Sequence, residues 1–234
     1  MMENLSTQKI LTIDIGGSHI KAVILNAAGG IISDYKRVST PVPAKPEPLL
    51  TAIKQLVTDF DFDKISVGFP GYVKNGIVIT APNLETASWS GYNLELALSK
   101  SLQRPVKVVN DADLQGLGLA NGKGLELVIT LGTGFGTALI NNGLLLPHLE
   151  LAHHPVTKNQ TYDEYIGQKA FDKSGKKRWN KRMKSVIRNL KTVFHYDHLY
   201  ISGGNADQLS FNLEPNISID SNREGIKGGA KLWA

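Results

Sequence analysis

The chain of 234 residues contains no cysteine, which excludes disulfide bonds and thiolate metal sites. Long apolar runs are also missing, since none approaches the roughly 18 residues that a membrane-spanning helix needs. Residues 1–6 lack the basic and apolar regions of a secretory signal peptide. Together these absences predict a cytoplasmic protein without a membrane partner.

Aromatic residues are scarce, at 7% of the chain, but the remaining composition is that of an ordinary folded protein. Hydrophobic residues make up 41% and charged residues 20%, which excludes a disordered chain. A chain of this length can bury a core in one large domain, or in two small domains with a cleft between them.

Acidic residues are absent from residues 173–191, a segment that carries nine Lys and Arg residues. The rest of the chain is mildly acidic, although the net charge is +5. Apolar residues recur at helical spacing over residues 176–194, so we expect an amphipathic helix there. Its basic face is either the solvated side of a packed helix or a surface for a polyanion such as polyphosphate. The apolar stripe disfavours nucleic acid as the partner.

One pattern of strands and turns occurs twice in the chain. Two expected strands flank a glycine turn within residues 9–25, and two more flank a second glycine turn within residues 125–140. Strands joined by turns this short must be antiparallel. Each pair then continues into an Asn/Gly turn. The repetition predicts an α/β fold with two lobes, a central cleft and a phosphate-binding turn on each wall.

The rest of the chain alternates strand and helix patterns. Further strands are expected at 31–35, 65–69, 72–73, 77–79, 106–109, 199–202 and 217–219, and further helices at 49–60, 94–102, 112–120 and 224–233. No linker is evident, so we place the domain division after Val109. The expected domains are a small one at residues 1–109 and a larger one at residues 110–234, whose last helix can pack back on the first.

A carboxylate precedes the first glycine turn. Gly16 and Gly17 let backbone N–H groups approach a phosphate without a Cβ in the way. Asp14, at the end of the expected strand, can hold Mg²⁺ through water, because this ion keeps much of its hydration shell. The same residues also fit a simple β-turn that is capped by an aspartate.

The second glycine turn carries three glycines and a threonine, in Gly132-Thr133-Gly134-Phe135-Gly136. It is followed by a strand pattern, whereas a dinucleotide-binding fingerprint must open a helix. A loop of this kind can wrap a phosphate, and it also fits a glycine-rich hairpin. The presence of the same device in both halves favours the phosphate interpretation.

Asn110 and Asp111 lie between a short apolar strand and a helix pattern. Open α/β sheets bind their ligands at this edge. A carboxylate there can accept a hydroxyl proton during phosphoryl transfer, so we assign the general base to Asp111. Helix capping is the alternative role for such residues, and we expect Asp113 to be the cap.

Glu150 and His153 are three residues apart and could bind adjacent sugar hydroxyls, one accepting and one donating a hydrogen bond. A metal site and a plain surface loop are equally compatible with this pair taken alone.

In their order along the chain, these motifs resemble those of the ROK family of sugar kinases, repressors and uncharacterised reading frames. The matching segments are 14–18, 68–71, 81–83, 110–112, 132–136, Glu150 with His153, and 202–204. They span nearly the whole chain, and the ordered set is far more specific than any one motif. The compact length and the basic run at 177–182 are most similar to the polyphosphate glucokinase branch.

The resemblance implies an actin-like ATPase (ribonuclease-H-like) fold, in which sugar and phosphoryl donor meet in the cleft. The implied glucose-binding residues are Asn83, Asn110, Asp111, Glu150 and His153. The implied phosphate- and nucleotide-binding residues are Asp14, Gly16, Gly17, Ser18, Lys21, Gly132, Thr133, Gly134, Gly203, Gly204 and Asn205.

The implied activity is that of a glucokinase. It would transfer a phosphoryl group from ATP, polyphosphate or both to the 6-hydroxyl of glucose, with Mg²⁺ near Asp14. Mannose, fructose or an amino sugar is an alternative acceptor, and a sugar-binding protein without catalysis is a further alternative. The family habit also implies a homodimer.

The chain departs from the family pattern in three places. Ala152 replaces the usual glycine between the acid and the histidine, and its methyl group could shift the loop that positions His153. The cysteine-rich zinc motif of many members is missing, so we expect no zinc site. A later glutamate that often contacts the sugar has two candidate counterparts, Asp163 and Glu164.

Overall fold

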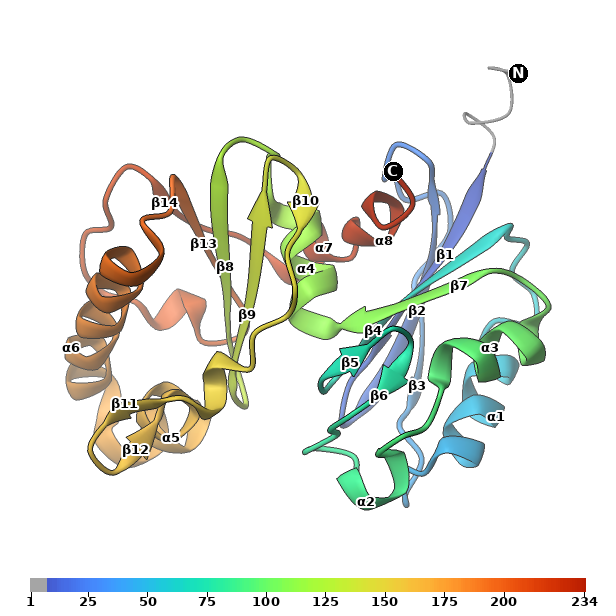
Figure 1. The fold of residues 1–234 in the computed structure, drawn as a ribbon, viewed down its shortest axis with the longest axis horizontal. Coiled ribbons are helices and arrows are strands. Elements are labelled where there is room, and N and C mark those ends of the chain that lie inside the picture. The colour runs from blue at the N-terminus through green and yellow to red at the C-terminus, as the bar shows by residue number, and fades with distance from the viewer. Residues whose placement is uncertain (1–7) are drawn as a thin grey trace. The chain divides into compact units, whose positions relative to one another are not determined.

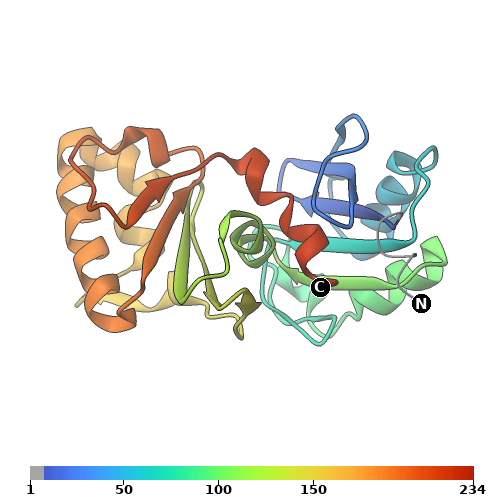
Figure 2. The same cartoon turned by 90° about the horizontal axis from the view of Figure 1, so that it is seen from above.

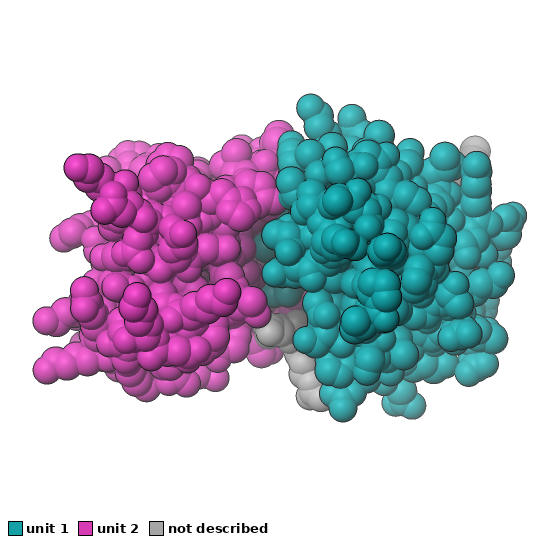
Figure 3. Space-filling view, turned by 90° about the horizontal axis from the view of Figure 1, so that it is seen from below, with its two compact units in different colours: residues 1–118, 226–234 teal, residues 119–225 magenta. Residues whose placement is uncertain are grey.

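The computed structural model of the chain describes residues 8–234, apart from the side chains of residues 222 and 223. The chain divides into two compact units, which Figure 3 colours separately. Unit 1 consists of residues 1–118 and 226–234, and unit 2 of residues 119–225. In the part of the chain that the structure describes, no helix is both long and apolar enough to cross a membrane.

Unit 1 contains a five-stranded sheet in the order β3-β2-β1-β4-β7 (Figure 1). Its strands are β1 (Lys9–Ile15), β2 (His19–Asn26), β3 (Lys36–Ser39), β4 (Lys64–Phe69) and β7 (Val106–Asn110). The strands β1, β2 and β3 pair antiparallel, as the short first turn requires, and β4 and β7 pair parallel to β1. The carboxyl ends of β1, β4 and β7 therefore meet at one edge of the sheet.

Helices cover both faces of this sheet. On one face, α1 (Pro46–Leu56) and α3 (Leu94–Leu102) pack on the alternate residues Leu11, Ile13 and Ile15 of β1. On the other face, α8 (Gly228–Lys231) packs on β1, β2 and β4. Because side chains alternate along a strand, Asp14 shares the α8 face of β1 with Ile10 and Thr12 rather than the α1 face.

Unit 2 repeats the strand order of unit 1. Its sheet runs β10-β9-β8-β13-β14, with the first three strands antiparallel and the last three parallel. The strands are β8 (Leu125–Leu131), β9 (Phe135–Asn141), β10 (Leu144–Leu145), β13 (His198–Ser202) and β14 (Ile217–Ile219). The repetition read from the sequence is thus present in the topology of both sheets.

The long helix α6 (Gln168–Phe194) covers one face of the second sheet (Figure 2). Trp179, Met183 and Val186 of its apolar stripe share a core with Leu127 and Ile129 of β8. The helix is broken at Gly175, whose φ of 71° and ψ of 158° are not helical. The segment after the break starts at residue 176, where the sequence predicts the helix to begin.

Shorter elements complete the fold. They are β5 (Val73–Lys74), β6 (Ile77–Val78), α2 (Thr86–Trp89), α4 (Asp111–Leu119), η1 (Leu151–His153), β11 (Pro155–Thr157), β12 (Gln160–Thr161), α5 (Tyr162–Ile166), η2 (Ala206–Gln208) and α7 (Asn222–Gly225). The turn between β5 and β6 has positive φ at Asn75 and Gly76, as an Asn-Gly hairpin requires.

Three expected elements differ in the structure. The helix expected at 49–60 starts and ends earlier, as α1 (Pro46–Leu56). In place of a strand at 31–35, only Ile31 makes a bridge to Leu25, because the Ser33 hydroxyl takes the N–H of Ile24. In place of one helix at 224–233, two short helices form. The second of them packs so closely on α4 that a Cβ on Gly228 would overlap the Leu114 carbonyl.

The units divide nine residues later than the sequence suggested, after Gly118 rather than after Val109. The reason is α4, which packs into unit 1: a Cβ on Gly68 of β4 would lie 2.9 Å from the Leu114 side chain. The last residues, 226–234, return to unit 1, where the Ser66 hydroxyl donates to the Gly229 carbonyl at 2.6 Å.

A buried carboxylate fixes the start of unit 2. Glu126, only 1% exposed, accepts hydrogen bonds from the N–H groups of residues 121–123 and from the hydroxyl of Tyr200 at 2.9 Å. Burial, followed by the hydrogen bond to Glu126, raises the pKa of Tyr200 to about 12 from 10.0. The folded chain therefore holds the phenol proton more tightly than the unfolded chain does.

This difference predicts alkaline destabilisation. The contribution of Tyr200 to the free energy of unfolding is fully present below pH 10. It is lost as the pH rises to about 12, a loss of roughly 2–3 kcal/mol. Tyr200→Phe should remove this share, so the free energy of unfolding of the variant should fall less steeply from pH 10 to 12. Denaturant unfolding across that range measures it, and parallel curves for the two proteins would contradict the assignment.

Candidate functional site

The first glycine turn, residues 16–18, is held in shape by a buried threonine. Gly16 donates to the carbonyl of His19 at 2.9 Å, which closes the turn between β1 and β2. Thr40, 6% exposed, donates its hydroxyl to the Gly16 carbonyl at 2.6 Å and its N–H to the Ser18 carbonyl at 2.9 Å. The carbonyls of Gly16 and Ser18 are thus bonded, while Gly17 and Ser18 are exposed to solvent.

Asp14 and Lys21 face each other across the β1–β2 pair beside this turn. Their side chains form an ion pair of 3.3 Å, and they are 22% and 49% exposed. A half-exposed pair of this kind contributes at most about 1 kcal/mol, so either group can exchange its partner for a ligand at small cost. A single carboxylate with access to water fits a hydrated Mg²⁺, which takes its other ligands from water and phosphate.

Asn83 lies against the same turn, although it is far from it in sequence. A Cβ on Gly17 would lie 3.7 Å from the Cβ of Asn83, so the two backbones approach closely. The Asn83 side chain is exposed. Within unit 1, the structure thus brings Asn83, a residue expected to bind the sugar, next to the turn expected to bind phosphate.

Asn110 and Asp111 form the junction of β7 and α4. The amide of Asn110, 7% exposed, donates to the Gly71 carbonyl at 3.0 Å, and its oxygen accepts the N–H of Ala112 at 2.8 Å. Asn110 therefore performs the capping that the sequence assigned to Asp113, which is 3% exposed inside α4. Asp111 is half-buried, and one of its oxygens also accepts the Ala112 N–H, at 2.9 Å.

The second glycine turn, residues 132–134, is supported from behind. Gly132 donates to the Gly134 carbonyl at 3.1 Å, and the Gly132 carbonyl accepts the N–H of Gln168, the first residue of α6, at 3.1 Å. The amide of Asn205 donates to the Gln168 side chain at 2.9 Å, and its N–H donates to the Leu131 carbonyl at 3.0 Å. A Cβ on Gly132 would meet no atom within 4 Å, so this part of the turn is open.

Of the two candidate acids after the turn, Asp163 lies at the site. Its carboxylate accepts the N–H of Phe135 at 2.6 Å and would lie 2.9 Å from a Cβ on Gly134. Burial raises the pKa of Asp163, and the Phe135 N–H and His153 partly offset this effect. Glu164 instead accepts the N–H of Thr161 at 2.9 Å, in a capping box at the start of α5.

Glu150 and His153 are brought together as expected, with 3.7 Å between Oε2 and Nε2. A third residue, His148, approaches Glu150 Oε1 at 3.5 Å with a side chain that is 7% exposed. The hydrogen bond with His148, which is the largest effect, and the nearby histidines lower the pKa of Glu150. Glu150 is thereby kept ionised as a hydrogen-bond acceptor. Ala152 fits without a break in η1, whose turn is closed by the His153 N–H and the Glu150 carbonyl at 3.2 Å.

Sequence reasoning missed Thr40, His148 and Gln168 as parts of these sites. Each acts through a tertiary contact, and none stands in a recognisable motif with the residue that it supports. Among the residues that the structure describes, no group of three or more His, Cys, Asp or Glu side chains could hold a metal ion by itself.

Comparisons with known proteins find relatives in sequence and in fold. Residues 10–153 match the sequence pattern of the ROK family. A polyphosphate glucokinase from Mycobacterium leprae (strain TN) is 34% identical over 237 residues, which cover 93% of this chain and 72% of the relative. The inorganic polyphosphate/ATP-glucomannokinase from Arthrobacter sp. strain KM is 29% identical, with a TM-score of 0.83 and coverage of 96% of this chain and 97% of that one.

A more distant likeness concerns the fold alone. The ROK family glucokinase from Streptomyces griseus, solved with glucose and AMPPNP, has a TM-score of 0.75 at 21% identity, over 96% of this chain and 98% of that one. The fold class predicted from the sequence, an actin-like α/β fold, is confirmed.

Gly203 offers a test of the support behind the second turn. Its φ is 96°, and an added Cβ would overlap the backbone of Leu131. Gly203→Ala should therefore lower the free energy of unfolding by about 2–4 kcal/mol in urea titrations. The neighbouring Gly204→Ala is the matched control. A Cβ at Gly204 meets nothing within 4 Å, so a change below about 1 kcal/mol is expected. Equal stability of the two variants would contradict this packing.

Proposed function

Because this chain belongs to the ROK family, we propose that it is a glucokinase that transfers a phosphoryl group to the 6-hydroxyl of glucose. Like its relatives that are named polyphosphate glucokinase, it is a phosphotransferase with an alcohol acceptor. The single observation that most supports the proposal is the placement of Asp111. Asn110 anchors it to the backbone at the carboxyl end of β7, where α/β sheets bind ligands.

Asp111 acts as the general base in this proposal. A sugar hydroxyl is a poor nucleophile, and it attacks phosphorus well only if a nearby carboxylate accepts its proton. The Ala112 N–H holds one oxygen of Asp111 at 2.9 Å, which fixes the carboxylate without neutralising it. Asn83, Asn110, Glu150 and His153 bind the other hydroxyls, and Asp163, the acid at the second glycine turn, joins them.

The donor phosphates bind to the two glycine turns. The N–H groups of Gly17, Ser18, Thr133 and Gly134 provide the hydrogen-bond donors, since those of Gly16 and Gly132 are bonded inside the turns. The Thr133 hydroxyl adds another donor. Lys21 leaves its 3.3 Å pair with Asp14 to contact a phosphate oxygen. Mg²⁺, held by Asp14 through water, would supply positive charge that stabilises the phosphate oxygens. Gly203, Gly204 and Asn205 border the adenosine when ATP is the donor.

Either ATP or polyphosphate can fill this role, and the Arthrobacter relative is named for both. The same name includes mannose as well as glucose, so mannose is the second acceptor that we propose to test. A matrix of these donors against glucose, mannose, fructose and an amino sugar defines the reaction. Glucose should give the highest kcat/KM. Donor hydrolysis at full rate without any sugar would instead indicate an ATPase.

Asp111→Asn tests the base directly. The asparagine keeps an oxygen for the Ala112 N–H, so the thermal unfolding temperature should change little. The variant cannot accept the hydroxyl proton, and kcat with glucose should fall by at least about 100-fold. Near-normal turnover would rule out the role assigned to Asp111.

A further inference from the structure

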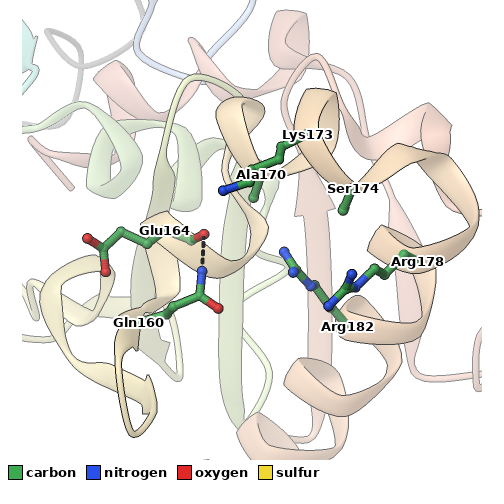
Figure 4. A pocket seen from close by; sticks show the side chains of 7 residues that line it. All are labelled: Gln160, Glu164, Ala170, Lys173, Ser174, Arg178 and Arg182. Carbon is green, nitrogen blue, oxygen red and sulfur yellow. Dashed lines mark hydrogen bonds between the residues drawn. The ribbon is translucent and has the colours of Figure 1, made fainter.

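We propose that a hollow in unit 2, between β12, α5 and α6, binds phosphate groups of inorganic polyphosphate (Figure 4). This proposal rests on the proposed function and deepens it, because it gives the distal part of a long phosphoryl donor a place to bind. The hollow has a volume of ≈ 390 Å³. Small-molecule sites in proteins commonly measure about 300–1,000 Å³.

The lining of the hollow is strongly basic. Lys173, Arg178 and Arg182 contribute three cations, and Glu164 is the one acid in the lining. The Glu164 carboxylate is bonded to the Thr161 N–H at 2.9 Å and points away from the two guanidinium groups in Figure 4. Over the described residues, none of these three cations has a carboxylate within ion-pair distance. The hollow therefore presents uncompensated positive charge.

The break in α6 shapes this hollow. Arg178 and Arg182 are one helical turn apart and lie on the same face of the segment after Gly175. Lys173 and Ser174 precede the break and form the adjoining wall. The φ of 71° at Gly175 suits glycine, which needs no Cβ to be accommodated in this region. The bend thus places cations from two helical segments around one space.

Arg182 is held ready for a ligand. Its Nη1 donates to the Tyr165 carbonyl at 2.9 Å, and its guanidinium lies 4.7 Å from the centre of the Tyr165 ring. Arg178, four residues earlier, carries the same charge, and like charges at this spacing repel each other. A phosphate between them would remove that repulsion, and the planar guanidinium matches two phosphate oxygens at once.

Ser174 adds a polar group to the lining that also favours a phosphate ligand. Its hydroxyl oxygen is buried, and it has no hydrogen-bond partner among the described residues. Buried hydroxyl groups are generally hydrogen-bonded, so an unsatisfied one in the lining of a basic hollow is notable. A phosphate oxygen would accept a hydrogen bond from this hydroxyl.

The hollow shares its supporting elements with the second glycine turn. Asp163 of α5 accepts the N–H of Phe135, and Gln168 at the start of α6 donates to the Gly132 carbonyl. In this proposal a chain of several phosphates contacts both the turn and the hollow, whereas a single phosphate occupies one of them. Long polyphosphate should accordingly bind more tightly than tripolyphosphate or inorganic phosphate.

Paired variants of the full chain test this site by calorimetric titration with long-chain polyphosphate, tripolyphosphate and inorganic phosphate at 0.15 M salt. Arg178→Gln with Arg182→Gln should weaken binding of long polyphosphate at least about tenfold, because two charge-assisted contacts are lost. Lys177→Gln with Lys181→Gln is the matched control: it has the same spacing and charge loss on the same helix, but lies outside the hollow. This pair should weaken binding less than about threefold, because Lys177 and Lys181 act on a ligand in the hollow only from a distance, where salt screens their charge.

Three results would overturn the proposal. The first is an equal loss of polyphosphate affinity in both pairs of variants, which would indicate a diffuse electrostatic attraction to the helix. The second is equal affinity for inorganic phosphate and long polyphosphate, and the third is no binding of polyphosphate to the unaltered chain. Arg178→Gln alone guards against misfolding, since Arg178 is exposed and Arg182 keeps its contact with Tyr165. It should weaken polyphosphate binding by about threefold or more with an unchanged unfolding temperature, and unchanged binding would also count against the hollow.

The titration needs no turnover, so it separates the two proposals. Selective loss of polyphosphate binding in the arginine pair, found in a protein that phosphorylates no sugar, would support the hollow and refute the glucokinase activity. Glucose phosphorylation by ATP in a protein that does not bind polyphosphate would do the reverse.

Discussion

A phosphate can reach backbone N–H groups only where no Cβ stands in the way and where the loop cannot fold back on its own amides. In each glycine turn one N–H group, that of Gly16 or Gly132, is bonded inside the loop, and contacts from distant segments hold the rest of the turn in shape. Thr40 bonds two carbonyls of the first turn, and Gln168 and Asn205 hold the second turn in place. The shape of each turn thus depends on residues outside it.

The carboxylates are likewise held in place by neighbouring residues. The side-chain amide of Asn110 donates to the Gly71 carbonyl, and its oxygen accepts the N–H of Ala112. These two bonds orient the following residue, Asp111. His148 orients Glu150 and keeps its pKa low, whereas burial beside the second turn raises the pKa of Asp163. The pKa values of Glu150 and Asp163, two acids of unit 2, are therefore shifted in opposite directions by their surroundings.

Patterns that are local in sequence could be predicted, and tertiary effects could not. The strand boundaries of β1 and β8 and the start of the second segment of α6 follow from periodicity and glycine placement, and these agree with the structure. The expected strand at 31–35 failed because the Ser33 hydroxyl replaced a ladder bond. The expected final helix is two short helices instead, and the close packing of Gly228 and Gly229 against neighbouring segments is a requirement that periodicity does not record. Likewise, the choice between Asp163 and Glu164 needed the contact with Phe135, which lies 28 residues away in the chain.

The central claim is that both glycine turns bind the same phosphoryl donor through their backbone amides. The most direct measurement is amide NMR of chain labelled with ¹⁵N-glycine, titrated with AMPPNP in the presence of glucose and Mg²⁺. The account predicts that the signals of Gly17 and Gly134 move together and saturate at one donor concentration. Signals that stay in place, or that saturate at different donor concentrations, would contradict it.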